Sequence, residues 1–172
     1  MITLVTGGSK CGRSSYAEGL LQGAEGAKIY IATMMPYGEE AQITISRHME
    51  MRRGKGFETV ERYTDIGGAV IPVGSSVLIE DIGNLCANEM FCEEPADDPC
   101  GRIVSGIKAL AEKAEDIVMV TSQTGSDGID YDGGTAEYIK VLGQVNAALA
   151  QTADNVIECV YGIPVALKGK IG

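Results

Sequence analysis

A glycine-rich segment near the start of the chain constrains the fold more than any other feature of the sequence. It follows the apolar run Ile2–Thr6 and leads into a stretch with helical spacing. The segment reads Gly7, Gly8, Ser9, Lys10, Cys11, Gly12, Arg13 and Ser14. Glycines in a tight turn between a strand and a helix N-terminus direct backbone N–H groups at an anion. The sequence therefore predicts a phosphate-binding loop at these positions.

The loop matches the phosphate-loop pattern G-x-x-x-x-G-K-[ST] at all but one of its defined positions. Ser14 stands where the pattern places the hydroxyl that binds magnesium, while Arg13 takes the place of the lysine. Because a guanidinium is wide, planar and forked, we expect it to pair with phosphate in a different pose from a lysine ammonium. The alternative is a glycine-rich turn between a strand and a helix that binds nothing.

Short apolar runs alternate with stretches of helical spacing along the chain. We expect strands at Ile2–Thr6, Lys28–Ala32, Ser76–Ile79, Ile117–Thr121, Asn155–Val160 and Ile163–Leu167. We expect helices at Ser14–Leu21, Glu39–Arg53, Leu85–Phe91, Ile103–Glu115 and Thr135–Ala150. This alternation is typical of an α/β fold, here P-loop and RecA-like, with a mostly parallel sheet flanked by helices. The last two strands predict an antiparallel C-terminal hairpin, and the absence of a linker predicts a single domain over 1–172.

The charge of the chain disfavours one class of partner. With 14 Lys and Arg residues against 24 Asp and Glu, the formal net charge is -10. General nucleic-acid binding requires basic residues that displace counterions from phosphates, so we expect no nucleic-acid partner. A nucleotide remains compatible with this charge, because one loop and a magnesium ion can supply a local positive field.

Nothing in the sequence predicts export or a membrane span. The apolar run at the N-terminus is too short for a signal peptide and lacks a basic flank. No run approaches the roughly 20 apolar residues that cross a bilayer. The five cysteines are odd in number and never spaced as Cys-x-x-Cys, which is typical of free thiols in a reducing compartment. We therefore expect a cytoplasmic protein.

Two carboxylates, Glu80 and Asp81, directly follow the apolar run Ser76–Ile79. In P-loop enzymes an acidic side chain at such a strand end orients magnesium or accepts a proton from the attacking hydroxyl. Neighbouring strand residues point to opposite faces, so one carboxylate suffices, with Glu80 the first choice and Asp81 the second. Together with Ser14 they form the predicted metal site. The alternative is a polar strand end before the turn at Gly83.

His48 is the single histidine of the chain and lies in a predicted helix beside Arg47, Arg52 and Arg53. A neutral imidazole nitrogen can attack phosphorus and form a covalent phosphoramidate. The neighbouring arginines could stabilise phosphate charge. From composition alone the favoured interpretation is a surface histidine on a solvated basic helix. What reverses this preference is a resemblance that runs along the whole chain.

In order and spacing, these features resemble the adenosylcobinamide kinase / adenosylcobinamide-phosphate guanylyltransferase family of cobalamin assembly. No single segment is decisive, but the ordered set is specific. The segments that carry the resemblance are Leu4–Ser14 with Ala17-Glu18, Tyr30–Thr33, Ile45–His48, Thr59–Glu61, Leu78–Glu80 with Asn88, Val118–Thr121, Gly143–Asn146, Ala153-Asp154 and Gly162–Pro164.

The resemblance implies two reactions. A nucleoside triphosphate, ATP or GTP, phosphorylates the aminopropanol arm of adenosylcobinamide; the histidine at His48 then takes GMP from GTP and passes it to the new phosphate. Carried over by position, Gly7–Ser14 hold phosphates, Ser14 binds Mg²⁺, and Glu80 serves the metal or the proton. The resemblance also implies a symmetric homo-oligomer, a trimer, with sites between subunits.

Several positions depart from the family pattern. Arg13 replaces the loop lysine, and Ser122-Gln123 replaces an Asn-Glu pair after a strand. Lys140 stands at a usual aspartate, and Ala147 replaces a glutamine. Most of these changes alter charge or hydrogen bonding near the expected nucleotide site. Alternatives are therefore a transferase without kinase activity, a catalytically impaired relative that binds nucleotide or corrinoid, and a P-loop kinase for another small alcohol.

Overall fold

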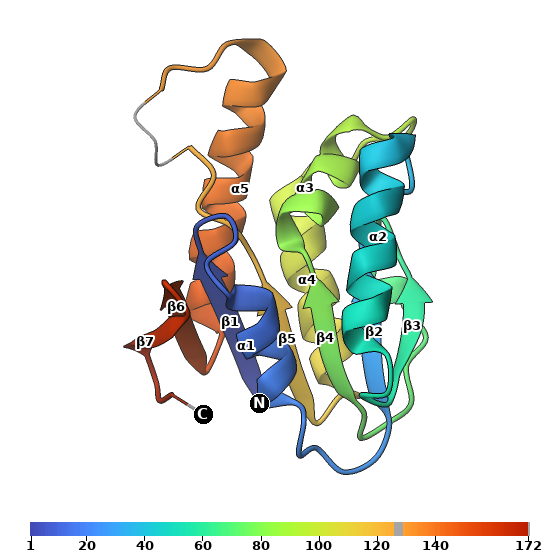
Figure 1. Cartoon of the computed structure of the whole chain (residues 1–172). Coiled ribbons are helices and arrows are strands. Elements are labelled where there is room, and N and C mark those ends of the chain that lie inside the picture. Colours follow the sequence, from blue (N-terminus) through green and yellow to red (C-terminus); the bar gives the residue numbers. More distant parts are fainter. Residues whose placement is uncertain (126–128, 172) are drawn as a thin grey trace.

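A seven-stranded sheet forms the centre of the protein in the computed structural model, which describes residues 1–125 and 129–171 apart from the Met51 side chain. Its strands are β1 (Ile2–Gly7), β2 (Lys28–Ala32), β3 (Phe57–Glu61), β4 (Ser76–Glu80), β5 (Asp116–Val120), β6 (Asn155–Val160) and β7 (Ile163–Lys168). The strand order is β3-β2-β4-β5-β1-β6-β7 (Figure 1). Only β6 and β7 pair antiparallel. The expected parallel sheet with a C-terminal hairpin is confirmed.

Helices cover both faces of this sheet (Figure 1). They are α1 (Arg13–Leu20), α2 (Gly38–Arg52), α3 (Ile82–Phe91), α4 (Pro99–Ala111) and α5 (Gly133–Thr152), with a 3-10 turn at Ile66–Gly68. Alternate strand residues point to opposite faces. Accordingly Ile29 and Ile31 join the apolar cluster under α3, α4 and α5, whereas Tyr30 joins the cluster under α1. Tyr30 therefore faces the side of the sheet on which α1 and α2 lie.

Helix α2 is held differently from the others. Among its residues whose side chains are described, only Arg52 is buried, at 7% exposure. His48 is half-buried, and large apolar side chains such as Ile43 and Met49 are exposed. An amphipathic helix is normally held by an apolar stripe. Helix α2 instead meets the sheet through polar side chains at its C-terminal half.

Side-chain caps explain where the structure departs from the expected helix boundaries. Helix α3 begins at Ile82, before the expected start, because the Asp81 side chain accepts a hydrogen bond from the Asn84 N–H at 2.7 Å. Helix α4 also begins early, at Pro99, where Asp98 accepts from the Gly101 N–H at 2.9 Å. The edge strand β3 was predicted only through the family resemblance, because its residues are half-exposed or exposed and form no apolar run.

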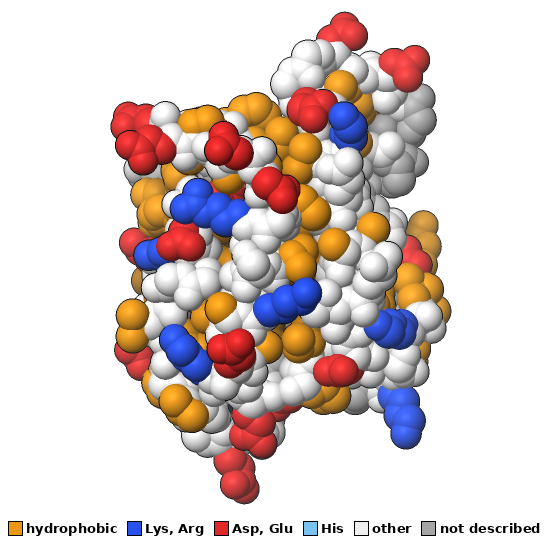
Figure 2. Space-filling model, turned by 180° about the vertical axis from the view of Figure 1, so that it is seen from behind, with side chains coloured by type: hydrophobic (Ala, Val, Ile, Leu, Met, Phe, Trp, Pro, Cys, Tyr) orange, Lys and Arg blue, Asp and Glu red, His pale blue; other side chains and the backbone are white. Residues whose placement is uncertain are grey.

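The face of the molecule opposite to the view of Figure 1 carries charge without a basic patch. Figure 2 shows its Lys and Arg side chains scattered among acidic and apolar ones. Over the described part of the chain, no helix has both the length and the apolar character needed to cross a membrane.

Candidate active site

A cleft of about 590 Å³ lies at the C-terminal ends of β1, β2 and β4, beside α2. This is the edge of a parallel sheet at which ligands bind. Among the residues of the expected site, the cleft is lined by Ser9, Lys10, Cys11, Gly12, Arg13, Ser14, His48, Glu80 and Asp81. Gly7 and Gly8 do not line it; Gly7 closes β1, and Gly8 is the first residue beyond that strand. The fold thus brings the phosphate loop, the acidic strand end and the lone histidine to one cavity.

The loop is held in shape by backbone conformations that favour glycine. Gly7 has a φ of +147° and Gly12 a φ of +94°. A Cβ on Gly7 would lie 2.6 Å from the carbonyl oxygen of Cys159, its partner in β6. The turn between β6 and β7 also supports the loop, because the Gly162 N–H donates to the Cys11 carbonyl at 2.9 Å. The C-terminal hairpin therefore buttresses the loop from outside the cleft.

Arg13 folds back onto the loop that precedes it. Its Nη1 donates to the carbonyl oxygens of Gly7 at 2.7 Å and Gly8 at 3.3 Å, and its Nη2 lies 4.0 Å from Asp81 Oδ2. A lysine ammonium could not make this forked set of contacts, because it presents a single point charge. In this pose the guanidinium braces the loop against the end of β4.

Glu80 is the centre of the polar network in the cleft. It is 7% exposed, and its Oε1 accepts a hydrogen bond from the Ser14 hydroxyl. Its Oε2 accepts from the Tyr30 hydroxyl at 3.3 Å and lies 3.6 Å from His48 Nδ1. One buried carboxylate thus joins the helix after the phosphate loop, the strand β2 and the histidine of α2.

These contacts shift the pKa values of the network. The Glu80 carboxylate, 3.6 Å from Nδ1, raises the pKa of His48 above its ordinary 6.5, against the opposing effects of burial and of Arg52 and Arg47. Burial on its own would raise the pKa of Glu80, but contacts with His48 and Ser14 outweigh it and lower that pKa. Burial and Glu80 together raise the pKa of Tyr30, which stays a neutral hydroxyl donor.

Of the residues predicted to hold magnesium, Ser14 and Glu80 fit and Asp81 does not. Ser14 and Glu80 bring a hydroxyl and a carboxylate oxygen together, the hard oxygen ligands that Mg²⁺ prefers beside water and phosphate. Asp81 instead caps α3 through the Asn84 N–H and faces Arg13. No cluster of three or more His, Cys, Asp or Glu suited to a metal occurs among the described residues. A metal here would depend on oxygens of the substrate.

The remaining departures from the family pattern lie outside the lining of this cleft. The side chain of Gln123 donates to Glu158 Oε1 at 2.8 Å, and the Ser122 carbonyl accepts from Asn146 at 3.1 Å. Lys140 lies 3.7 Å from Glu137 on the exposed side of α5. Lys140 therefore adds no charge to the lining of this cleft.

Two residues to which the sequence analysis gave no role at the site hold it together. Tyr30 interrupts an otherwise apolar strand, and its hydroxyl is the polar tip that reaches Glu80. Asn88 of α3 donates to the carbonyls of Thr33 at 2.8 Å and Tyr63 at 2.9 Å, which ties together the chain segments after β2 and β3. For Tyr30, its position between the apolar residues Ile29 and Ile31 was the available signal. The contacts of Asn88 depend on tertiary structure.

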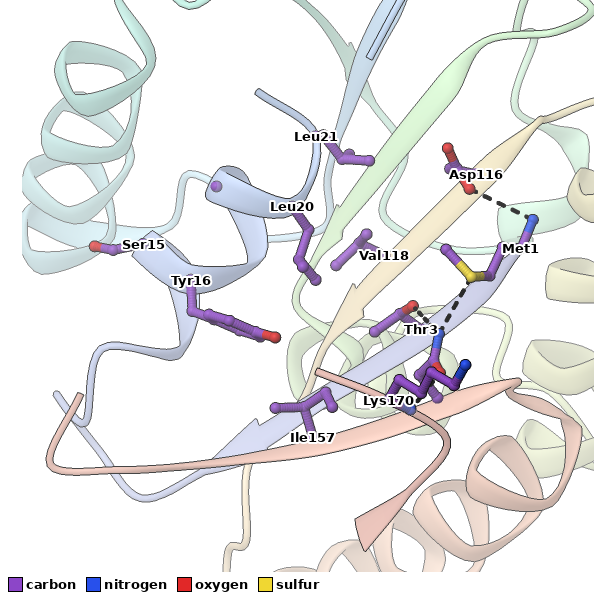
Figure 3. A pocket seen from close by; sticks show the side chains of 12 residues that line it. Met1, Thr3, Ser15, Tyr16, Leu20, Leu21, Asp116, Val118, Ile157 and Lys170 are labelled. Atoms are coloured by element: carbon purple, nitrogen blue, oxygen red, sulfur yellow. Dashed lines mark hydrogen bonds and ion pairs between the residues drawn. The ribbon is translucent and has the colours of Figure 1, made fainter. Parts of the chain in front are cut away.

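A second hollow, of about 470 Å³, lies on the other side of α1 (Figure 3). Tyr16 and Leu20 of α1 face Val118 and Ile157 of the sheet across it, and its lining includes none of the predicted catalytic or metal residues. The Met1 ammonium, which lines it, lies 3.5 Å from Asp116. The predicted catalytic and metal residues therefore gather at the first cleft.

A parallel sheet whose first strand leads through a glycine loop into a helix, with the carboxylate at the end of β4 in the same cleft, defines a P-loop protein of the nucleotide-binding class. The family model for cobinamide kinase / cobinamide phosphate guanyltransferase matches residues 3–167. The chain belongs to this family of enzymes of cobalamin biosynthesis, as the sequence resemblance predicted.

Relatives of similar length support this assignment. The bifunctional adenosylcobalamin biosynthesis protein CobU of Escherichia coli (strain K12) is 30% identical, over 98% of this chain and 100% of its own length. CobP of Pseudomonas aeruginosa, with the same description, is 25% identical over 99% of both chains. CobU of Salmonella typhimurium is 26% identical over 98% of this chain and 100% of its own. Among solved structures, the P4 protein of bacteriophage phi6 in complex with ADP aligns over 95% of this chain and 52% of its own, at 16% identity and a TM-score of 0.37, which supports no functional conclusion.

Proposed function

We propose that this protein phosphorylates adenosylcobinamide and then transfers GMP from GTP to the new phosphate through a guanylyl group on His48. The observation that carries the proposal is the placement of His48 in the cleft of the phosphate loop, with its Nδ1 3.6 Å from the buried Glu80 carboxylate. A surface histidine on a solvated helix, the alternative from composition, would have no such partner. Family membership supplies the chemistry to which this placement is suited.

The geometry assigns different roles to the two imidazole nitrogens. Because Nδ1 faces Glu80, a proton on Nδ1 leaves Nε2 with its lone pair directed away from the carboxylate. Nε2 forms a bond to the α-phosphorus of GTP, and the bond from that phosphorus to the bridging oxygen breaks, so that pyrophosphate leaves with the electron pair. An oxygen of the corrinoid phosphate then attacks the same phosphorus, and the electron pair of the P–N bond returns to His48. Glu80 holds the ring and stabilises the positive charge that it gains.

For the first reaction, Glu80 is placed to accept the proton of the attacking hydroxyl, since it lies in the cleft and its lowered pKa keeps the carboxylate ionised. Ser14 and Glu80 would hold Mg²⁺, which when bound neutralises charge on the triphosphate. Backbone N–H groups of Gly7–Ser14 would bind the phosphates themselves. GTP and ATP as substrates and a homotrimer stay predictions from the family resemblance, and a cytoplasmic location stays a prediction from the sequence.

Covalent labelling tests the transferase. Wild-type protein incubated with GTP labelled at the α-phosphate should retain label after denaturation, and the label should be acid-labile and alkali-stable, as a phosphoramidate is. His48→Asn should retain none, while GTP labelled at the γ-phosphate should leave none on either protein. Wild-type protein that stays unlabelled under these conditions, at any Mg²⁺ concentration, would remove the guanylyl-histidine from the proposal.

One observation favours a second candidate, a transferase without kinase activity. Arg13 Nη1 is bound to the carbonyls of Gly7 and Gly8, so the residue at the lysine position is engaged by the loop itself. Transfer of the γ-phosphate depends on a cation at that position more than guanylyl transfer does. Incubation with adenosylcobinamide and γ-labelled ATP or GTP separates the two candidates, since phosphorylated corrinoid is expected only from the bifunctional enzyme. Arg13→Lys restores the lysine of the phosphate-loop pattern and is therefore the variant in which kinase activity should appear if the wild type lacks it.

A further inference from the structure

Two arginines of α2 and a third directly after it differ in their environments. Arg53, the residue after α2, has a side chain that is 80% exposed and lies 3.5 Å from Glu50. Arg47 lines the cleft and is exposed. Arg52 also lines the cleft, but it is only 7% exposed. A buried guanidinium is exceptional, because arginine stays charged and is almost never fully buried without a partner.

Arg52 stacks on an aromatic ring, but among the described residues it forms no ion pair. Its guanidinium carbon lies 3.2 Å from the centre of the Tyr30 ring. Its Nη1 is buried and has no hydrogen-bond acceptor in the part of the chain that the structure describes. Stacking on an aromatic face offsets part of the desolvation of a cation, yet it leaves the N–H donors unsatisfied. A residue whose only task was to fix α2 to the sheet would be better served by an apolar side chain.

The surroundings of Arg52 connect it to the reacting histidine. His48 and Arg52 are four residues apart, so they lie on the same face of α2. The Tyr30 ring on which Arg52 stacks donates its hydroxyl to Glu80 Oε2, the atom 3.6 Å from His48 Nδ1. The positive charge of Arg52 also acts on His48, whose pKa it lowers. Arg52 and His48 thus border the same space in the cleft.

We propose that Arg52 binds a non-bridging oxygen of the phosphate that His48 attacks, with Tyr30 holding the plane of the guanidinium. The inference rests on the proposed guanylyl transfer and adds a residue to it. As the bond from Nε2 to phosphorus forms and the bond to pyrophosphate breaks, negative charge grows on the equatorial oxygens, and Arg52 stabilises it through two N–H donors without giving up a proton.

A single-turnover experiment with full-length protein tests this role. The rate constant for formation of the guanylyl-protein from saturating α-labelled GTP is measured for wild type, Arg52→Ala and Arg53→Ala. The rate should fall about 100-fold in Arg52→Ala, the loss typical of one preorganised donor, and change less than twofold in Arg53→Ala. Guanidinium chloride added at millimolar concentration should raise the rate constant of Arg52→Ala at least tenfold. Sodium chloride at equal ionic strength should leave that rate constant unchanged.

The outcomes are distinguishable from failure of the function itself. Absence of label on wild type would end the guanylyl transfer, whereas label on wild type and on Arg52→Ala at rates within threefold of each other would overturn the role of Arg52 alone. A loss of rate in a folded Arg52→Ala that guanidinium leaves unchanged would likewise contradict it. If Arg52→Ala does not fold, Arg52→Lys is measured in its place. Lysine keeps the charge but loses the forked donors and the stacking on Tyr30, so we expect the rate constant to fall about tenfold. An unchanged rate constant would refute the proposal.

Discussion

Replacing Gly7 by alanine is the sharpest perturbation of the phosphate loop that the structure allows. Gly7 has a φ of +147°, a conformation that side-chain-bearing residues rarely adopt. A Cβ there would lie 2.6 Å from both Cys11 Sγ and the Cys159 carbonyl oxygen. The thiol can rotate away, but the carbonyl belongs to β6, which pairs with β1 in parallel register up to this point. The clash is therefore with fixed backbone.

The size of the effect follows from these distances. Reaching an ordinary contact of 3.4 Å from 2.6 Å requires a displacement of 0.8 Å at the base of the loop. The unfavourable φ contributes about 1–3 kcal/mol of strain, which lowers Tm by roughly 2–4 °C per kcal/mol in a domain of this length. A shift of nearly 1 Å in groups that position a substrate costs about 100-fold in rate. We expect GTP-dependent thermal stabilisation to be lost and labelling of His48 to fall by about that factor.

Gly8→Ala is the matched control, because it lies in the same loop and a Cβ there would meet nothing within 4 Å. Both variants are compared by thermal unfolding with and without GTP and Mg²⁺, and by single-turnover labelling. Without GTP, Gly8→Ala should unfold at the wild-type temperature, and its labelling should fall far less than that of Gly7→Ala. If Gly7→Ala binds GTP and forms label as Gly8→Ala does, the steric argument for this loop is wrong.

Two further predictions concern the residues at the end of β4. Because His48 is the sole histidine, its imidazole can be titrated by NMR without ambiguity in metal-free protein; its pKa should exceed 6.5, and Glu80→Gln, which removes the largest cause of the shift, should lower it. Because the pKa is raised in the folded protein, protonation of His48 stabilises the fold fully below pH 6.5, and this contribution is lost as the pH rises through the folded-state pKa. An unchanged pKa of His48 in Glu80→Gln would contradict the contact between the two side chains. Asp81→Ala removes the cap of α3 and should lower the free energy of unfolding by about 1 kcal/mol, measured by urea denaturation. Asp81→Asn, which keeps the accepting oxygen, should recover most of that loss, and the Mg²⁺ dependence of labelling should be the same in both variants.

Most of the sheet could be predicted from local sequence, because each buried strand is an apolar run that ends in a turn. The edge strand β3 could not, since its residues are half-buried or exposed and form no apolar run. The starts of α3 and α4 were missed for a related reason: a single capping carboxylate, Asp81 or Asp98, sets each boundary without any change in apolar spacing.

The site likewise combines residues that local sequence predicts with contacts that depend on tertiary structure. The phosphate loop is contiguous in sequence, so its glycines and Ser14 could be recognised directly. The contacts of Glu80 with Tyr30 and His48 depend on two parallel strands and a helix meeting at one sheet edge, which no spacing encodes. The pose of Arg13 follows from the two loop carbonyls within its reach, and only coordinates reveal it.

The distribution of charge explains how an acidic protein can hold a triphosphate. Among the described residues that line the cleft, the cations are Lys10, Arg13, Arg47 and Arg52, and the carboxylates are Glu80 and Asp81. Positive charge is therefore in excess here, although the whole chain carries a formal charge of -10. Since Arg13 is engaged by loop carbonyls and by Asp81, the cations left for phosphate lie on the loop at Lys10 and across the cleft on α2. In the proposed reaction, positive charge supplied from α2 would act on the phosphorus nearest His48 more than on the phosphates in the loop, and this asymmetry would favour guanylyl transfer over transfer of the γ-phosphate.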